Sequence, residues 1–153
     1  MDADHALRRL TGSDLAAIYA LDQRCFAPGI AYSTAEMRAM LLRRGFHAAI
    51  EAGGELGGFI LTEMNRGHGH VITLDVAPEH RRRGLGLALM RAAEDHYRAT
   101  GARGMSLEVA VNNAGALAFY TRLGYRVARR LPGYYARDLD ALRLEKPLAD
   151  AMR

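Results

Sequence analysis

Arg81-Arg82-Arg83-Gly84-Leu85-Gly86 is the stretch that decides the fold, because it joins a strand-like apolar run to a helix-like one. The strand is predicted over residues 71–76, and Pro78 ends it. The apolar residues that follow recur at helical spacing: Leu85, Leu89, Ala92, Ala93 and Tyr97. Glycines at 84 and 86 let the backbone approach a ligand, and the first amides of the new helix carry the positive end of its dipole. The junction is therefore predicted to bind a diphosphate.

Two common nucleotide-binding motifs do not fit this junction. A Walker A loop ends in Gly-Lys-Ser/Thr, whereas the sole lysine of the chain is Lys146. The dinucleotide fingerprint needs Gly or Ala three places after its second glycine, and position 89 is Leu. The alternative to a phosphate site is a basic, glycine-rich loop that only caps a helix.

Length and composition favour one domain over residues 1–153. Half of the 153 residues are apolar, which is enough for a sizeable core. The single Cys25 excludes an internal disulfide, and no His/Cys cluster has zinc spacing, so we expect no metal. His68-Gly69-His70 is the only close histidine pair, and its glycine-flanked setting predicts a solvent-exposed turn.

Charge and hydropathy limit the partners. The net charge of +4 is carried almost entirely by arginine and would attract phosphate-bearing or acidic partners. The chain lacks the interleaved aromatic and basic residues or the recognition helix of a nucleic-acid binder, so we expect no nucleic-acid partner. Residues 1–5 hold no apolar segment, and no run approaches the roughly 18 apolar residues of a membrane span. We therefore expect a cytoplasmic protein without a membrane partner.

The spacing of apolar residues and turn residues predicts a mixed α/β fold. Strands are expected over residues 5–10, 46–52, 56–64, 71–76, 104–109, 125–130 and 142–148, and helices over 15–24, 34–45, 85–100 and 113–123. Gly53-Gly54 and Pro132-Gly133 are the expected hairpin turns. The order β-α-α-β-β-β-α-β-α-β-β predicts a mixed central sheet with hairpins at both ends.

A second motif lies between Glu108 and Tyr125. It reads Glu108-Val109-Ala110-Val111-Asn112-Asn113, followed by Ala116-Leu117, Tyr120 and Leu123-Gly124-Tyr125. With Arg81-x-x-Gly84-x-Gly86, it resembles the GCN5-related N-acetyltransferase (GNAT) superfamily over nearly the whole chain, and is most similar to ribosomal-protein N-terminal acetyltransferases of the RimI type. The resemblance implies an acetyl-CoA-dependent N-acetyltransferase. It also implies direct attack, in a ternary complex, by the α-amine of a protein or peptide N-terminus.

The resemblance assigns the coenzyme A contacts to the loop, the strand before it and the helix after Asn113. It implies that strands 71–76 and 104–109 part to admit the pantetheine arm, which meets backbone groups near Leu74 and Val76. The implied set is Leu74, Val76, Arg81, Arg82, Arg83, Gly84, Leu85, Gly86, Leu87, Ala88, Asn113 and Tyr120. The alternatives are a helix cap for Asn113 and a core aromatic for Tyr120.

The same resemblance implies two catalytic residues. Glu108 lies where RimI-type enzymes have their proposed general base, with Asp75 as a second candidate and a solvent-facing carboxylate as the alternative. Tyr120 would donate to the departing thiolate. Full proton transfer from a phenol of pKa about 10 to a thiolate whose thiol has pKa about 8.5 is uphill by about 2 kcal/mol. Tyr120 therefore has either a lowered pKa or only a hydrogen bond to the sulfur.

The acceptor site is expected around four aromatic residues and one acid: Phe26, Tyr32, Asp75, Tyr134 and Tyr135. Their alternative role is ordinary packing of loops on the core. The chain departs from the RimI type in this half, with Ala110 where Arg is usual and Tyr32 where Trp is usual.

The chemistry of the acceptor favours an α-amine over a lysine side chain. Their reference pKa values are about 7.7–8.0 and about 10.4, so the α-amine needs less help to lose its proton. A small-molecule amine, a lysine side chain and a non-catalytic acyl-CoA-binding module are the alternatives. We expect a monomer or a weak dimer.

Overall fold

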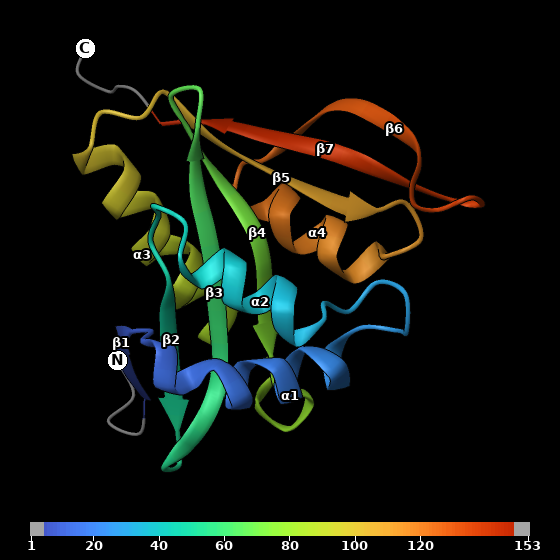
Figure 1. Ribbon diagram of the computed structural model, residues 1–153. Helices are drawn as coiled ribbons and strands as arrows, with labels where there is room; N and C mark the ends of the chain where they lie inside the picture. The colour runs from blue at the N-terminus through green and yellow to red at the C-terminus, as the bar shows by residue number, and fades with distance from the viewer. Residues whose placement is uncertain (1–4, 149–153) are drawn as a thin grey trace.

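The computed structural model describes residues 5–148, and these form one seven-stranded sheet with helices on both faces (Figure 1). The strands are β1 (His5–Arg9), β2 (Ala48–Ala52), β3 (Glu55–Asn65), β4 (His68–Val76), β5 (Gly104–Ala110), β6 (Arg126–Ala136) and β7 (Leu139–Pro147). Their order across the sheet is β1-β2-β3-β4-β5-β7-β6, and only the β4–β5 pair is parallel. The predicted mixed α/β fold and the predicted order of elements are confirmed.

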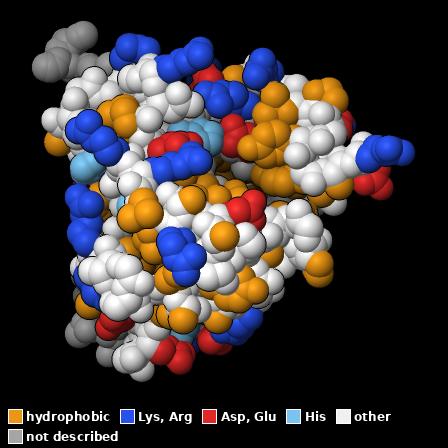
Figure 2. Space-filling view, in the orientation of Figure 1, with side chains coloured by type: hydrophobic (Ala, Val, Ile, Leu, Met, Phe, Trp, Pro, Cys, Tyr) orange, Lys and Arg blue, Asp and Glu red, His pale blue; other side chains and the backbone are white. Residues whose placement is uncertain are grey.

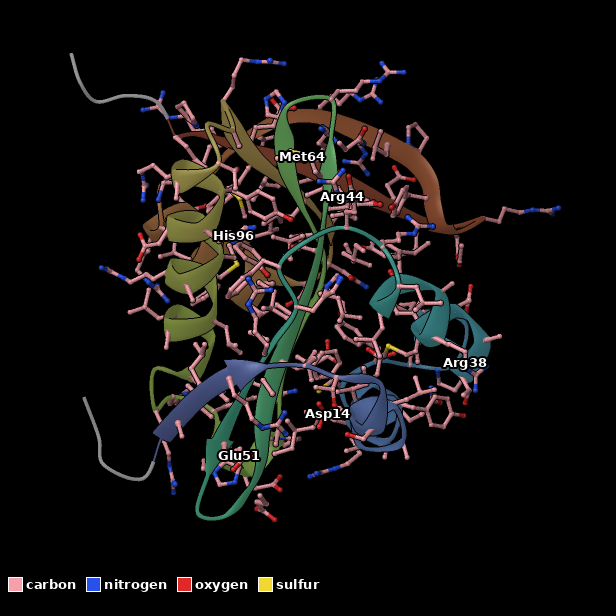
Figure 3. All side chains as sticks on the ribbon, turned by 60° about the vertical axis from the view of Figure 1, so that its left-hand side comes forward. Asp14, Arg38, Arg44, Glu51, Met64 and His96 are labelled. Atoms are coloured by element: carbon pink, nitrogen blue, oxygen red, sulfur yellow. The ribbon has the colours of Figure 1, made fainter. Side chains whose placement is uncertain are left out.

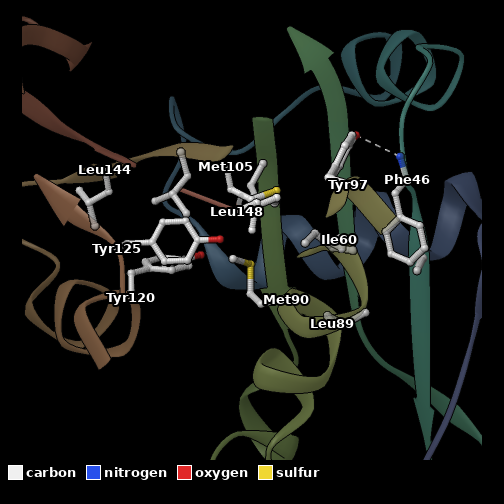
Figure 4. Close-up of a cluster of buried hydrophobic side chains, with 14 of the residues drawn as sticks. Phe46, Ile60, Leu89, Met90, Tyr97, Met105, Tyr120, Tyr125, Leu144 and Leu148 are labelled. Carbon is white, nitrogen blue, oxygen red and sulfur yellow. Dashed lines mark hydrogen bonds between the residues drawn. The ribbon is translucent and has the colours of Figure 1, made fainter. Parts of the chain in front are cut away.

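The helices divide the core into two parts. Helices α1 (Leu15–Cys25) and α2 (Thr34–Leu41) cover one face, where Ile18 and Met37 pack against Phe59 of β3. Helices α3 (Leu85–Ala99) and α4 (Ala114–Arg122) cover the other face, which holds the larger cluster of buried side chains (Figure 4). Short 3₁₀ helices, η1 (Gly12–Asp14) and η2 (Pro78–His80), precede α1 and α3. No helix within residues 5–148 meets the length and hydropathy of a membrane span.

Local sequence explains several boundaries. Ser33 and Glu36 form a capping box at the start of α2, with bonds of 2.8 Å and 3.1 Å. Gly53 and Gly54 both have positive φ, 60° and 82°, as a two-residue hairpin turn requires, so this predicted turn is confirmed. At the far end of β3, Met64 and Arg44 lie together (Figure 3), and the Met64 amide donates to the Arg44 carbonyl at 3.3 Å.

Three predicted boundaries differ from the structure. Helix α2 ends at Leu41 rather than near residue 45. Strand β2 begins at Ala48 rather than at Phe46, because the Phe46 amide donates to the Thr62 side chain, at 2.9 Å, instead of to a main-chain carbonyl of a neighbouring strand. Pro132-Gly133 is not the last hairpin turn, which lies at residues 137–138. Pro132 is tolerated within β6 because this is the edge strand of the sheet.

The prediction that residues 68–70 form a solvent-exposed turn is wrong. The turn lies at Arg66 and Gly67, which have φ of 52° and 82°, and residues 68–70 begin β4. Gly69 is buried against Tyr97, and a Cβ at this position would lie 2.5 Å from the tyrosine ring. The glycine therefore serves close packing of α3 on the sheet rather than a turn.

A β-bulge in β4 determines which side chains reach each face. Thr62 of β3 pairs with Val71 and Leu61 pairs with Thr73, so Ile72 is an extra residue. Val71 packs in the cluster under α3, whereas Ile72 packs in the cluster under α1. The bulge shifts by one residue the alternation of side chains between the two faces of the sheet. The side chains of residues 70, 73 and 75 therefore all face the side of α1.

Candidate active site

Two adjoining cavities lie where β4 and β5 separate. The larger has a volume of 850 Å³ and extends along the start of α3. The smaller, of 370 Å³, lies between β4, β5 and the loop after α1. Both are lined by Phe26, Leu74, Asn113, Ala116 and Tyr120, so they meet there. In the space-filling view, hydrophobic side chains gather around the hollow between the β6–β7 arm and the helices α1 and α2 (Figure 2).

The predicted phosphate loop forms one end of the larger cavity. Gly84 has φ of 83° and directly precedes α3, which begins at Leu85. The Ala88 amide donates to the Gly84 carbonyl within the helix, whereas the amides of residues 85–87 precede the first helical hydrogen bond and are free for an anion. The loop residues that line the cavity are Arg81, Arg82, Gly84, Leu85, Gly86 and Leu87. Arg83 and Ala88 are not among them.

Arg81 also fastens the loop to the end of β4. Its Nε donates to the Val76 carbonyl at 3.1 Å, and the Cys25 thiol lies 3.5 Å from the same oxygen. The Val76 carbonyl is therefore engaged from two sides. Burial raises the pKa of the Cys25 thiol to about 11, so this thiol is protonated at neutral pH and can donate.

The space for an extended ligand arm lies between β4 and β5. Their parallel pairing joins residues 68–70 to residues 104–106, and further along Leu74 of β4 and Leu107 and Val109 of β5 line the smaller cavity. Asn113 caps α4, because its Oδ1 accepts from the Ala116 amide at 3.1 Å. The Asn113 side chain therefore keeps its NH₂ group for a ligand. Whether the strands hold a pantetheine arm stays a prediction.

Tyr120 lies where the two cavities meet and also belongs to the core. Its ring contacts that of Phe119 edge-on, at 5.0 Å between centroids. It also contacts the ring of Tyr125 edge-on, at 5.8 Å between centroids (Figure 4). Burial raises the pKa of Tyr120 above its usual value, and the nearby Asp75 adds to the shift. The hydroxyl is thus a hydrogen-bond donor at neutral pH.

Glu108 is held in a polar cluster on the α1 face of the sheet. Its Oε1 lies 3.0 Å from Nε2 of His70, and its Oε2 lies 3.2 Å from Nη1 of Arg143. The Tyr134 hydroxyl lies 3.4 Å from Oε1, and the Tyr135 hydroxyl donates to the Glu108 carbonyl at 3.2 Å. The Glu108 side chain is 10% exposed, so the alternative of a solvent-facing carboxylate is excluded.

Sequence reasoning missed His70 as a member of this cluster. Its Nδ1 lies 2.8 Å from the Ser106 hydroxyl, which leaves Nε2 for Glu108. The available signal was Arg66-Gly67, a two-residue turn that would have placed residues 68–70 at the start of the strand.

The predicted acceptor residues are only partly brought together. Phe26, Tyr32 and Tyr135 line the smaller cavity with Glu108, and burial raises the pKa of Tyr32 to about 12. Tyr134 is half exposed and contacts Glu108 from the outside. Asp75 lines the larger cavity instead and is buried, with its Oδ1 accepting from the Thr73 hydroxyl at 2.6 Å.

Comparison with known proteins defines the class. The sequence model of the Acetyltransferase (GNAT) family matches residues 15–125. An uncharacterised N-acetyltransferase of Methanocaldococcus jannaschii is 33% identical over 146 residues, covering 95% of this chain and 93% of that protein. The chain belongs to the GNAT acetyltransferase family. It is therefore an acetyltransferase, with acetyl-CoA as its cofactor.

Three further comparisons concern acetyltransferases that have names. The ribosomal protein bS18-alanine N-acetyltransferase of Escherichia coli is 28% identical over 131 residues, covering 86% of this chain and 87% of that protein. A crystal structure of the E. coli ribosomal-protein-S18-alanine N-acetyltransferase matches with a TM-score of 0.88 at 27% identity, covering 96% of each chain. The fold is also that of Arabidopsis thaliana NAA60 in complex with acetyl-CoA, with a TM-score of 0.83, 22% identity, and 94% and 99% of the two chains covered.

Proposed function

We propose that this acetyltransferase transfers the acetyl group of acetyl-CoA to the α-amine of a protein or peptide N-terminus. The observation that carries the proposal is the position of Glu108, a carboxylate at a cavity whose walls include the apolar and aromatic residues Phe26, Ile30, Tyr32 and Tyr135. Such walls suit an extended peptide end better than a small polyamine, which would need several acidic side chains. The similarity to the bS18-alanine N-acetyltransferase supports the same class of acceptor.

The larger cavity fits the acyl donor. Its volume of 850 Å³ and the free amides at the start of α3 suit an extended ligand with a diphosphate. We propose that the acyl donor is held by Leu74, Val76 and Asn113 together with the loop residues that line this cavity, which are Arg81, Arg82, Gly84, Leu85, Gly86 and Leu87. When bound, acetyl-CoA supplies an activated thioester carbonyl, and the Val76 amide would donate a hydrogen bond to the oxygen of that carbonyl. A donor aimed at developing negative charge contributes about 100-fold or more in rate.

Glu108 is proposed as the general base. The acceptor nitrogen attacks the thioester carbon, the carbon–sulfur bond breaks, and the proton of the attacking amine passes to Glu108, directly or through one water. His70 and Arg143 hold the two carboxylate oxygens, which fixes the direction of the Glu108 side chain.

Tyr120 is proposed to hydrogen-bond the departing sulfur rather than to transfer its proton completely. Of the two possibilities that the sequence leaves, a lowered pKa is disfavoured because burial raises the pKa of Tyr120. The hydroxyl would stabilise the thiolate as a donor, and the proton needed to form the free thiol would then come from solvent.

Short peptides test the acceptor class. Release of free thiol from acetyl-CoA would be measured with one peptide that has a free N-terminus and no lysine, the same peptide with a blocked N-terminus and an internal lysine, and a set of small polyamines. We expect turnover with the first alone. Turnover confined to the blocked peptide or to the polyamines would refute an α-amine acceptor while leaving the acetyltransferase assignment intact.

We further propose that the enzyme acts in the cytoplasm as a monomer or weak dimer. Gel filtration at several concentrations tests the second part. Elution at one subunit mass, or a concentration-dependent shift toward two, would agree with it, and a stable larger assembly would not.

A further inference from the structure

Two carboxyl groups that the proposed mechanism does not use meet in the interior between α1 and β4. Asp22 of α1 and Asp75 of β4 have exposed fractions of 0% and 1%, and the two side chains lie within hydrogen-bonding reach of each other. Asp22 Oδ2 accepts from the Tyr32 amide at 2.8 Å, and Asp75 Oδ1 accepts from the Thr73 hydroxyl at 2.6 Å. The other oxygen of each group, Asp22 Oδ1 and Asp75 Oδ2, is buried and has no donor among the described residues.

Such a pair is explained most simply by a hydrogen between the two groups. Two buried carboxylates in contact repel each other, and each unpartnered oxygen keeps an unmet desolvation penalty. One proton between them removes a charge and gives both free oxygens a partner, in a strong charge-assisted O–H···O⁻ bond. We propose that Asp22 and Asp75 share one proton, and that this pair is a positioning element which holds the acceptor side of the active site against the donor side.

The position of the pair connects the two halves of the site. Asp22 fixes the end of the loop 26–33 through the Tyr32 amide, while the neighbouring Gln23 side chain donates to the Tyr32 carbonyl at 2.8 Å. That loop supplies Phe26 and Tyr32 to the smaller cavity. Asp75 lies between Leu74 and Val76, whose backbone is assigned to the donor. The catalytic consequence rests on the proposed function, whereas the shared proton itself does not.

The groups that face the pair are few. Cys25 on α1, Tyr32 in the following loop and Tyr120 from α4 face it as neutral acids, and the Thr73 hydroxyl faces it from β4. Arg81 is the positive group on this side, and its charge only partly opposes the effect of burial. The adjacent side chains of α2 and β3 are apolar, Met37, Phe59 and Leu61 among them.

The pair has a defined dependence on pH. Burial, followed by contact with Asp22, raises the pKa of Asp75 well above its usual range. A folded-state pKa above the unfolded value means that the stabilisation is fully present below the unfolded pKa of about 3.9 and is lost as the pH rises through the folded value. The joint between α1 and β4 should therefore weaken toward alkaline pH.

Two substitutions at Asp75 separate a shared proton from simple packing. Asp75→Asn places an amide N–H, which donates to Asp22 at every pH, whereas Asp75→Ala leaves Asp22 without that donor. Thermal unfolding would be followed from pH 5 to pH 9 for both variants and the wild type. We expect the melting temperature of the wild type to fall with rising pH relative to Asp75→Asn, and Asp75→Ala to be less stable than Asp75→Asn throughout. An identical pH dependence of the wild type and Asp75→Asn would overturn the shared proton.

Kinetics and spectroscopy complete the test. The KM for the acceptor peptide should rise several-fold in Asp75→Ala and be largely restored in Asp75→Asn. An equal KM in the wild type and Asp75→Ala would refute the positioning role.

Infrared spectroscopy tests the shared proton directly. At neutral pH the band of a protonated carboxylic acid should be present in the wild type and lost in Asp75→Asn, and its absence from the wild type would refute the shared proton. If Asp75→Ala does not fold, Asp22→Asn repeats the comparison from the other side. The unfolding and infrared experiments need no acceptor, so they still decide the matter if the proposed acceptor class fails.

Discussion

His70 and Glu108 face each other across the parallel strands β4 and β5, with 3.0 Å between Nε2 and Oε1. The two residues are distant in sequence, and the short parallel ladder at the start of both strands brings them together. Because Ser106 engages the other ring nitrogen, the imidazole is held from both sides. A catalytic carboxylate at Glu108 would thus be oriented before either substrate arrives.

Replacing Glu108 with glutamine should lower turnover without weakening donor binding. The amide cannot accept the proton of the attacking amine, so we expect kcat to fall about 100-fold or more. The KM for acetyl-CoA should stay near the wild-type value. Glu145→Gln is a matched control, because Glu145 also pairs with Arg143, at 2.9 Å, but lies outside both cavities. Wild-type turnover in Glu108→Gln would show that another group is the base.

Tyr120→Phe should reduce kcat far more than it reduces affinity for coenzyme A. The ring remains in the core, and only the donor for the departing sulfur is removed. Stopped-flow turnover and calorimetric titration with coenzyme A would measure the two effects. Unchanged turnover with poor coenzyme A binding would contradict the proposed role.

Tyr125→Phe should lower stability rather than turnover, in contrast to Tyr120→Phe. The Tyr125 hydroxyl donates to buried Glu94 at 2.7 Å, so loss of this hydroxyl should lower the free energy of unfolding by about 1–3 kcal/mol. We expect turnover of the folded enzyme to change little. Denaturant unfolding and steady-state kinetics would separate the two tyrosines.

Gly86→Ala should affect donor binding more than stability. The new Cβ would lie 3.5 Å from Phe119 Cζ and 3.6 Å from Val76 Cγ2, which are ordinary contacts, so the fold should tolerate it. The methyl group would occupy part of the larger cavity, and we expect the KM for acetyl-CoA to rise about 10-fold, which corresponds to about 1.4 kcal/mol. Gly12→Ala, at a position with no atom within 4 Å of the added carbon, is the control. An unchanged KM for acetyl-CoA in Gly86→Ala would mean that acetyl-CoA binds elsewhere.

Gly69→Ala should destabilise the fold. The added carbon would lie 2.5 Å from the Tyr97 ring, and the Tyr97 hydroxyl is itself 2.6 Å from the Thr62 hydroxyl, so the ring has little freedom to move. We expect a loss of about 1–3 kcal/mol in the free energy of unfolding, measured in urea. Wild-type stability in this variant would mean that α3 can shift on the sheet.

Most residues around the larger cavity could be predicted from the sequence because they are close together along the chain. The residues of the phosphate loop are consecutive, and the change from strand to helix that places them is visible in the spacing of apolar residues. Asn113 and Tyr120 lie on one short helix, so their relative positions also follow from the helical repeat. Gly84 takes the left-handed conformation for which its lack of a side chain suits it.

The polar contacts around the smaller cavity and behind it depend on pairings that no local pattern encodes. His70 reaches Glu108 only because of the register between β4 and β5, and Asp22 reaches Asp75 only because α1 docks on β4. The turn expected at Pro132-Gly133 fails for a similar reason. An edge strand tolerates a proline that would end an internal strand, and the sequence does not say which strand lies at the edge.

The bulge at Ile72 makes the local geometry of β4 as important as its composition. If β4 kept all its residues but alternated regularly through Ile72, Thr73 and Asp75 would turn toward α3, while Leu74 and Val76 would point at α1. A carboxyl group would then be buried in the large apolar cluster, and two apolar side chains would leave it. The two faces of this strand therefore depend on where a single unpaired residue is inserted.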